Sequence, residues 1–482
     1  MTPRQPLIPL DRVAITFMLG LVAATIILLW SGDRTLPQVR EFNWQNQNIG
    51  ADDIAFTLTF NRQIDRTTVE QQLKIQPPLP GKTSWAGSKM AYTLTNPAPY
   101  GNNYTIDLQG AREALGSKRG KEIIPFRGKF RTHDRMFAYI ATGAKDRGRL
   151  IIYNFKTHQP TALTPANLIV TDFKVDRNSE KLVFTAVDAQ TLKNGQPAIA
   201  SQQIYSVTTG INRHPPFIPP GKLELILDNR EYQNVKFDIA PDGKKLVAQR
   251  VSQKNPSDFA LWVVQLDKSV PPTKLKQSGD FVITPDSREV AAAVGQGVSI
   301  FPLTAEAGSS LDFLPKFGSV LSFTPDGTTA AMVKQNSNYT KSLFIVTNQG
   351  TEQEVLQTTG SIWDAQFAPT KDLIYCLTTE LQIKGNNSRE QPYLSAIDLK
   401  TKKVIPLMLL PVQQGIQMSL APDGLALMFD QIDRGESMLP LIQGQGNGVL
   451  WLLPIPPNIR TLTAALKAEE LPLPGWHPRW LP

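Results

Sequence analysis

The stretch Phe237-Asp-Ile-Ala-Pro241-Asp-Gly243-Lys-Lys-Leu246-Val-Ala248 places a Pro-Asp-Gly turn between two short apolar runs. Proline presets the backbone angle at the second position of a tight turn, aspartate hydrogen-bonds the backbone ahead of it, and glycine accepts a positive φ. The stretch therefore predicts a strand, a tight turn and a second strand.

Five further segments share this spacing, two of them in the degraded forms Arg177-Asn-Ser179 and Pro369-Thr-Lys371. The turns start at 177, 241, 285, 325, 369 and 422, so the intervals are 64, 44, 40, 44 and 53 residues. A period of about 40 to 45 residues with several short strands per unit is typical of a β-propeller whose loops absorb the longer intervals. We assign a structural role to the turn residues, which are Pro241, Asp242, Gly243, Pro285, Asp286, Pro325, Asp326, Gly327, Pro422, Asp423 and Gly424.

The two ends of the repeat region each supply part of one blade. From Met136 onward the chain has the outer strands of a unit without an innermost strand, whereas Gly475-Trp-His-Pro-Arg-Trp480 has the pattern of a strand with none after it. Because the two parts complement each other, we expect the last residues to close the ring inside the first blade. Together with the six turns this gives seven blades.

The hairpins that follow the turns, for example Ile204-Tyr-Ser-Val207 and Leu394-Ser-Ala-Ile-Asp398, resemble the TolB-type propeller repeat, which is PD40-like or WD40-like. The resemblance covers residues 135–482 and implies an all-β propeller there. Known members of that family have six blades, so a count of six stays open beside our seven.

Length and composition exclude several classes of protein. A chain of 482 residues exceeds one ordinary core, so at least two domains are expected. Hydrophobic residues make up 41% and charged residues 19%, which excludes a disordered chain and a multi-span membrane protein. The single cysteine, Cys376, cannot form an intramolecular disulfide, so the fold holds without covalent cross-links.

An uncharged run of 18 residues, Val13 to Trp30, lies near the N-terminus. As a helix it would be about 27 Å long, close to the thickness of a hydrocarbon core. A cleaved signal peptide is the alternative, but the run is long for a signal core and lacks a small-x-small site. We predict that residues 1–35 form a cytoplasmic tail and a transmembrane signal anchor, with the bulk of the chain extracytoplasmic, in the periplasm or an equivalent lumen.

Residues 36–134 have a sequence pattern that differs from the repeat. Apolar and polar residues alternate in Ile54 to Phe60, Met90 to Leu94 and Tyr104 to Leu108, and about seven such strands in this length predict a β-sandwich. These segments, together with Leu73-Lys-Ile-Gln-Pro77, Asn103 to Ile106 and Phe130-Arg-Thr132, resemble the Ig-like domain of bacterial S-layer proteins of the SbsA type. That resemblance implies a spacer outside the cell.

The last strand of this sandwich carries cations on one face, because Phe126, Gly128 and Phe130 alternate with basic residues. Residues 112–149 hold eleven Lys or Arg and four Asp or Glu, so their balance is 11 − 4 = +7 against +8 for the whole chain. One interpretation is a solvated edge that resists aggregation. The other is a contact for anionic lipid or an acidic partner, with the candidate binding residues Arg127, Lys129, Arg131, Lys145, Arg147 and Arg149.

Four long segments between strands interrupt the repeat, and propeller ligands commonly meet such loops. We therefore expect a partner to contact residues 188–203, 214–221, 384–391 or 430–448. Nucleic acid is not expected as a partner, because the chain is predicted to be extracytoplasmic.

The sequence shows no catalytic or metal-binding constellation. The four histidines are isolated, and there is no Walker loop, nucleophile elbow or dinucleotide fingerprint. We assign no catalytic, metal or cofactor residue, and predict a non-enzymatic scaffold or binding protein whose propeller face engages another envelope protein, peptide or polymer, in transport or envelope assembly. The alternative is a propeller hydrolase or lyase, whose central channel would be lined with converging Asp, Glu or His, or with a metal.

Overall fold

The chain contains two compact units in the computed structural model, which describes residues 9–31, 35–114, 120–191, 199–211, 217–275, 279–303, 312–385, 387–432 and 447–482. The first unit comprises residues 1–47, 55–93 and 104–130, and the second comprises residues 48–54, 94–103 and 131–482. Two short segments of the N-terminal half thus belong to the second unit.

Helix α1 (Pro9–Ser31) covers the apolar run that the sequence predicts to be helical. Its described side chains, from Val13 to Ile26, are exposed. Among the residues that the structure describes, no helix is both long enough and apolar enough to cross a bilayer. The membrane-spanning role of this segment therefore stays a prediction.

The described part of residues 39–132 forms two four-stranded sheets with the orders β1-β3-β6-β5 and β2-β8-β7-β4. Every second side chain of β3 is buried, as the alternating pattern predicts. A helix that the sequence analysis did not predict, α2 (Arg66–Gln72), starts at Asp65, whose carboxylate accepts the N–H of Thr67. The strands are β1 (Val39–Phe42), β2 (Asn48–Ile49), β3 (Ala55–Phe60), β4 (Leu73–Gln76), β5 (Gly81–Ala86), β6 (Lys89–Leu94), β7 (Asn103–Leu108) and β8 (Phe126–Thr132). The two sheets agree with a sandwich, whereas membership of the Ig-like family stays a prediction.

Aromatic rings fill the centre of this sandwich. Phe42 meets Phe56 edge to face with centroids 5.5 Å apart, and Trp44 lies 5.1 Å from Phe130. All four side chains are less than a tenth exposed. Each such ring contributes roughly 1.5–3 kcal/mol by leaving water, so the core is sizeable for a unit of this length.

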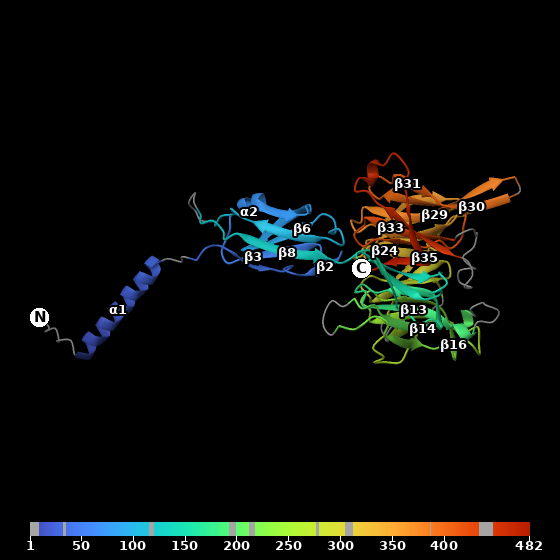
Figure 1. Ribbon diagram of the computed structural model, residues 1–482, viewed down its shortest axis with the longest axis horizontal. Coiled ribbons are helices and arrows are strands. Elements are labelled where there is room, and N and C mark those ends of the chain that lie inside the picture. Colours follow the sequence, from blue (N-terminus) through green and yellow to red (C-terminus); the bar gives the residue numbers. More distant parts are fainter. Residues whose placement is uncertain are drawn as a thin grey trace. The chain divides into compact units, whose positions relative to one another are not determined.

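The second unit is built of antiparallel sheets that follow one another along the chain, from green to red in Figure 1. Five sheets have four strands each, in the orders β12-β13-β14-β15, β16-β17-β18-β19, β20-β21-β22-β23, β24-β25-β26-β27 and β28-β29-β30-β31. Their strands are β12 (Leu168–Val175), β13 (Lys181–Asp188), β14 (Gln203–Thr208), β15 (Leu223–Leu227), β16 (Tyr232–Ile239), β17 (Lys245–Ser252), β18 (Phe259–Gln265), β19 (Thr273–Lys274), β20 (Phe281–Ile283), β21 (Glu289–Val294), β22 (Gly297–Pro302), β23 (Asp312–Leu314), β24 (Ser319–Phe323), β25 (Thr329–Gln335), β26 (Lys341–Thr347), β27 (Glu352–Thr358), β28 (Ile362–Phe367), β29 (Leu373–Lys384), β30 (Asn387–Asp398) and β31 (Val404–Leu409). Short 3-10 helices lie at Ala189–Thr191, Ile199–Ser201 and Ile459–Thr461.

The remaining strands form one seven-stranded sheet with the order β11-β10-β9-β35-β34-β33-β32. Its middle strand, β35 (Glu469–Trp480), pairs with β34 through Glu469 to Pro474 and with β9 through Gly475 to Trp480. One strand therefore completes two four-stranded sheets, and residues 136–480, as far as they are described, contain seven such sheets, as the split first blade predicts. The other strands are β9 (Met136–Ala141), β10 (Leu150–Asn154), β11 (Gln159–Ala162), β32 (Met418–Leu420), β33 (Ala426–Ile432) and β34 (Gly448–Pro454).

The first strand of each sheet lies next to the first strand of the following sheet, from β12 through β16, β20, β24 and β28 to β32 and β35. This is the arrangement of a β-propeller, in which the first strands surround the centre. The all-β propeller predicted from the repeat is therefore confirmed.

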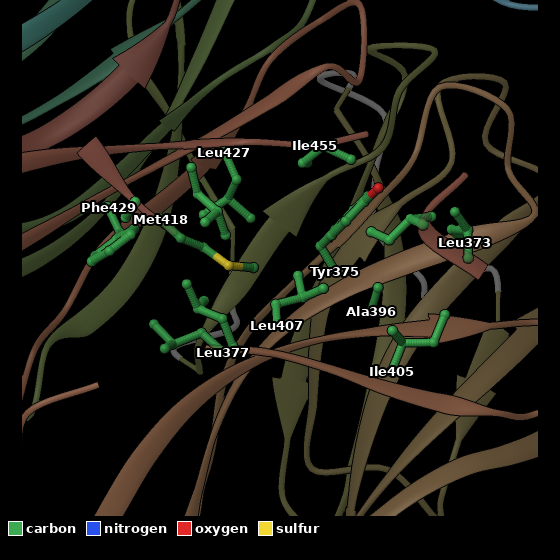
Figure 2. Packing of buried hydrophobic residues seen from close by; sticks show 14 of the residues in the cluster. Leu373, Tyr375, Leu377, Ala396, Ile405, Leu407, Met418, Leu427, Phe429 and Ile455 are labelled. Carbon is green, nitrogen blue, oxygen red and sulfur yellow. The ribbon is translucent and has the colours of Figure 1, made fainter. Parts of the chain in front are cut away.

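Buried apolar clusters join consecutive sheets. Figure 2 shows the one that packs Tyr375 and Leu407, of the sheet β28–β31, against Met418, Leu427 and Phe429 of the next sheet. A second cluster joins Phe137 to Met428, and a third joins Leu150 to Phe173. Because these two flank the split blade on both sides, the ring is closed by side-chain packing as well as by β35.

The prediction of a loop at residues 384–391 is wrong. Strands β29 and β30 continue through it as a hairpin that pairs Lys384 with Asn387, and this hairpin extends away from the other strands (Figure 1). Gly385, with a φ of 61°, allows the tight turn at its tip. Large parts of the other three predicted loops, residues 192–198, 212–216 and 433–446, lie outside the described residues.

Candidate functional site

The six predicted turns share one geometry. In each, the third residue has a positive φ between 57° and 73°. Its N–H donates to the carbonyl three residues earlier. The degraded copies form the same turn although they lack glycine, since Ser179 and Lys371 adopt the left-handed conformation as well. The other four third residues are Gly243, Ser287, Gly327 and Gly424.

The turn carboxylates cap the backbone, which agrees with the structural role that the sequence analysis assigns to them. The Oδ1 atom of Asp242 accepts the N–H of Lys244 at 2.9 Å, and the other three turn aspartates bond the N–H two residues ahead in the same way. The pKa of Asp326 is held well below its usual range, mainly by the Lys371 ammonium and to a smaller extent by hydrogen bonds from Thr324 and Thr328. The carboxylates of the turn aspartates thus have hydrogen-bond donors within the protein.

The innermost strands carry polar side chains at two recurring places, which are three and five residues before the start of the turn. At the first place stand Lys174, Asp238, Ser322, Gln366 and Ser419, with the apolar Val282 as the exception, and at the corresponding place of β35 stands Arg479. Most of these side chains are half-buried, although their neighbours along each strand are mainly buried and apolar. Bulges in β12, β16, β24 and β28 precede the first place. The propeller centre is therefore lined with charged and amide groups.

Two central carboxylates have no cation within ion-pair distance in the described part of the chain. Asp238 accepts the N–H groups of Ile239 at 3.0 Å and Ile283 at 3.2 Å. Asp364 accepts the N–H of Ala365 at 2.8 Å and the Gln366 amide at 2.7 Å. Burial raises the pKa of both carboxyls, because the charged form loses hydration that these bonds only partly replace.

The charge of Lys174 acts on both of these carboxylates. Its charge opposes the raised pKa of Asp238 and Asp364 and lowers the pKa of His477, so it acts on groups from β16, β28 and β35. Its ammonium makes no hydrogen bond or ion pair with any residue that the structure describes. The residue as a whole is half-buried.

Arg479 and His477 complete this central cluster from β35. Arg479 donates to the Met418 carbonyl at 3.1 Å and to the Gln417 amide oxygen at 3.2 Å. His477 packs on Phe173 with ring centroids 4.9 Å apart, and burial lowers its pKa to about 3, so its ring is neutral at pH 7. We call Asp172, Lys174, Asp238, Asp364, Gln366, His477 and Arg479 the central cluster.

Asp430 lies beneath the central cluster and is fully buried. Its carboxyl accepts the N–H of Gln417, just before β32, at 2.7 Å and the N–H of His477, in β35, at 2.6 Å, and so ties β33 to both segments. Burial raises its pKa to about 7. Asp430 is therefore a structural group whose charge depends on pH near neutrality.

The basic residues predicted as a binding surface are found in both units. Arg127 and Lys129 are exposed on β8, and the alternation along this strand is as predicted. However, Arg127 lies 2.6 Å from Asp107, Arg131 2.6 Å from Asp134, and Arg149 2.7 Å from Asp146. Lys145 is exposed and Arg147 is half-buried, while Lys118 and Arg119 lie outside the described residues. At least three of the six candidates are thus held in ion pairs.

The central cluster was not predicted from the sequence, because its residues form no catalytic motif and lie outside the repeated turns. A signal was present: in Phe237-Asp-Ile239 and Phe173-Lys-Val175 a charged residue stands between two apolar residues of a strand. Such a residue in an innermost strand points to the propeller centre. In the described residues no group of three or more His, Cys, Asp or Glu is placed to hold a metal ion.

No known protein family matches the sequence, and a search of curated proteins finds no match. Solved structures with a similar fold include TolB from Acinetobacter baumannii, with 13% identity, 64% of this chain and 77% of that chain covered, and a TM-score of 0.38. The periplasmic gluconolactonase of Pseudomonas aeruginosa has 12% identity, coverages of 72% and 99%, and a TM-score of 0.44. The oligogalacturonate lyase of Vibrio parahaemolyticus has 12% identity, coverages of 64% and 84%, and a TM-score of 0.46. Similarity at this level says nothing about what this chain binds or does.

Proposed function

We propose that the chain is a binding protein whose propeller holds part of another envelope protein, a peptide or a polymer at the central cluster. One observation carries the proposal: Lys174 has no partner among the described residues, while Asp238 and Asp364 have no cation within ion-pair distance. Charges that serve only the fold are usually paired, because an unpaired buried charge destabilises the chain. A ligand that brings groups of both signs would satisfy them.

The chemistry of the central cluster suits a ligand with donors and acceptors close together. The two carboxylates would accept N–H or O–H groups, and the Lys174 ammonium would bind a carboxylate or carbonyl oxygen. A segment of polypeptide offers both kinds of group. This role is compatible with a scaffold in transport or envelope assembly.

Charge reversal tests the proposal. We expect Lys174→Glu to reduce the amount of crosslinked partner recovered from intact membranes about tenfold, because it adds a fourth carboxylate to the central cluster and removes one of its cations. The matched control is Lys254→Glu, since Lys254 is exposed in the β17–β18 connection. Equal recovery from both variants and the parent protein would contradict a role for the central cluster.

The same proposal places the chain outside the cytoplasm, anchored by α1 with its N-terminus inside. The support is the apolar surface of this helix, on which Val13, Phe17 and Met18 are each about 70% exposed. A helix that is apolar all round requires a protein core or a membrane to cover it. Salt-washed membranes should retain the protein, and removal of residues 1–32 should release it. Recovery of the intact chain in the soluble fraction would contradict the anchor.

A second candidate function is a hydrolase or lyase with its site in the same place. The observation that favours it is the position of Asp364 in the central cluster, where burial raises the pKa of its carboxyl toward the range that suits a general acid. Lactones and uronate polymers are the substrates to assay. A decrease in turnover of at least about 100-fold in Asp364→Asn would support this function. If the parent protein turns over neither substrate class, the enzyme function is contradicted and the binding function remains.

A further inference from the structure

The first unit contains a cavity of about 660 Å³. Its residues are far in the sequence from those of the central cluster. Its walls come from α2, β4, β5 and β6, and the side chains of Leu73, Ile75 and Leu79 form an apolar part. A volume of this size is in the range of small-ligand and peptide sites. The cavity is wholly within the first unit.

Two strands that flank the cavity are sheet edges. In the described residues β5 is the last strand of the order β1-β3-β6-β5, and β4 is the last of β2-β8-β7-β4. An edge strand presents unpaired N–H and C=O groups along its free side. The prolines near the cavity, Pro77, Pro78 and Pro80, precede β5, so β5 itself keeps all its backbone donors.

The cavity contains one carboxylate that is fixed in place. Glu70 Oε1 accepts the Thr83 hydroxyl at 2.7 Å and the Trp85 ring N–H at 2.9 Å. These two bonds hold the pKa of Glu70 below its usual range, so the group is charged at neutral pH. Its second oxygen, Oε2, makes no hydrogen bond to any described residue.

Among the described residues, the cations near Glu70 form no ion pair with its carboxylate. Lys82 also lines the cavity, but it forms no ion pair with Glu70 in the part of the chain that the structure describes. The guanidinium of Arg66 lies over the Trp85 ring, 5.8 Å from its centroid, and forms no ion pair with Glu70. The cavity therefore combines an available carboxylate oxygen with an apolar wall.

From these features we propose that β5 and the cavity bind an extended segment of another protein that carries a lysine or arginine. The segment adds a strand to the free edge of β5, and its basic side chain enters the cavity. There the charged head binds Glu70 Oε2 and the aliphatic stem lies on Leu73 and Ile75. This inference is independent of the function proposed for the propeller.

Synthetic peptides test the inference on the full-length chain. The probes are fluorescein-labelled Thr-Val-Thr-Lys-Thr-Val-Thr and the same peptide with glutamate in place of lysine, with binding followed by fluorescence anisotropy. The lysine peptide should bind about fivefold more tightly than the glutamate peptide. Methylation of its alternate backbone nitrogens should weaken binding about tenfold in one of the two registers, because those N–H groups pair with β5.

Glu70→Gln separates the charge from the fold, because glutamine still offers an oxygen to Thr83 and Trp85. It should remove the preference for the lysine peptide. The matched control is Glu41→Gln, since Glu41 is exposed on β1, the opposite edge of the same sheet. Equal affinity for the two peptides, a preference that survives Glu70→Gln, or no saturable binding of either peptide would each overturn the inference.

Discussion

Asp238 and Asp242 stand four residues apart on one hairpin, yet they illustrate two different regions of the propeller. Asp242 is exposed at the turn and caps the N–H of Lys244. Asp238 is half-buried at the centre, where burial raises the pKa of its carboxyl. Asp242 accepts a donor from its own hairpin, whereas Asp238 also accepts the N–H of Ile283 from the next sheet. The difference agrees with a structural role for this turn, and it is the reason why we propose the centre as the binding site.

The largest expected effect concerns Asp430, whose folded pKa of about 7 lies above an unfolded value near 3.9. A raised pKa of a carboxyl stabilises the fold below pH 4, and this stabilisation is lost as pH rises to 7. Asp430→Asn cannot ionise, so its unfolding free energy relative to the parent should rise by about 4 kcal/mol between pH 4 and pH 7. Urea titrations at several pH values measure the difference.

The low pKa of His477 acts in the opposite direction, since that contribution is lost as pH falls from 6.5 to about 3. His477 is present in both chains, so its effect cancels in the comparison. A pH-independent difference between Asp430→Asn and the parent would show that burial does not control Asp430.

The next effect distinguishes two turn aspartates. The side chain of Asp423 is 1% exposed and accepts the N–H of Tyr100 at 3.0 Å, the N–H of Leu425 at 3.1 Å and the Arg135 guanidinium at 3.1 Å. Asp423→Ala should cost about 3 kcal/mol, because it leaves these donors without a partner. The exposed Asp242 should cost only about 1 kcal/mol when replaced by alanine. Similar melting temperatures for the two variants would mean that the turns are equivalent.

A smaller effect is expected at the turn glycines. Gly424 has a φ of 73°, and a Cβ there would lie 3.0 Å from Cδ of Pro369 in the neighbouring turn. Gly424→Ala should therefore cost about 2 kcal/mol, from backbone strain and crowding together. Gly350 has a φ of 81° and open space around it, so Gly350→Ala isolates the strain, at about 1 kcal/mol. If Gly350→Ala lowers the melting temperature more than Gly424→Ala does, crowding between the two turns is refuted.

The smallest effect concerns the basic residues of β8. Arg127→Gln should cost about 0.5 kcal/mol, because it loses the ion pair with Asp107, whereas Lys129→Gln should have no measurable effect on the melting temperature. If the surface binds anionic lipid, Lys129→Glu should weaken sedimentation with vesicles that contain phosphatidylserine. Unchanged sedimentation would favour the solvated-edge interpretation.

Much of the fold was predictable because it depends on local patterns. The Pro-Asp-Gly spacing determines each hairpin, and even Arg177-Asn-Ser179 forms the same turn, since the position in the repeat imposes the left-handed conformation on serine. The split first blade was also predictable, because a missing strand at Met136 and an extra strand at Trp480 complement each other. The hairpin through Gly385 was missed, because polar residues in a projecting strand pair look like a loop.

The central cluster illustrates what local patterns do not contain. Lys174, Asp364 and Arg479 are separated by 190 and 115 residues in the sequence, from 364 − 174 and 479 − 364. Each is one polar residue in an apolar strand. Only the ring brings them to one place, and only there does burial alter the pKa of Asp364.

The sequence alone determined the repeat, the turn conformation, the strand order within each hairpin and the need for a strand from the end of the chain to complete the first blade. These features follow from backbone preferences and side-chain alternation over fewer than about twenty residues. The tertiary structure decided that β35 serves two sheets, which charges face one another and which are left without partners. Those outcomes depend on distances between blades, and electrostatic and desolvation energies are set by such distances and not by sequence separation.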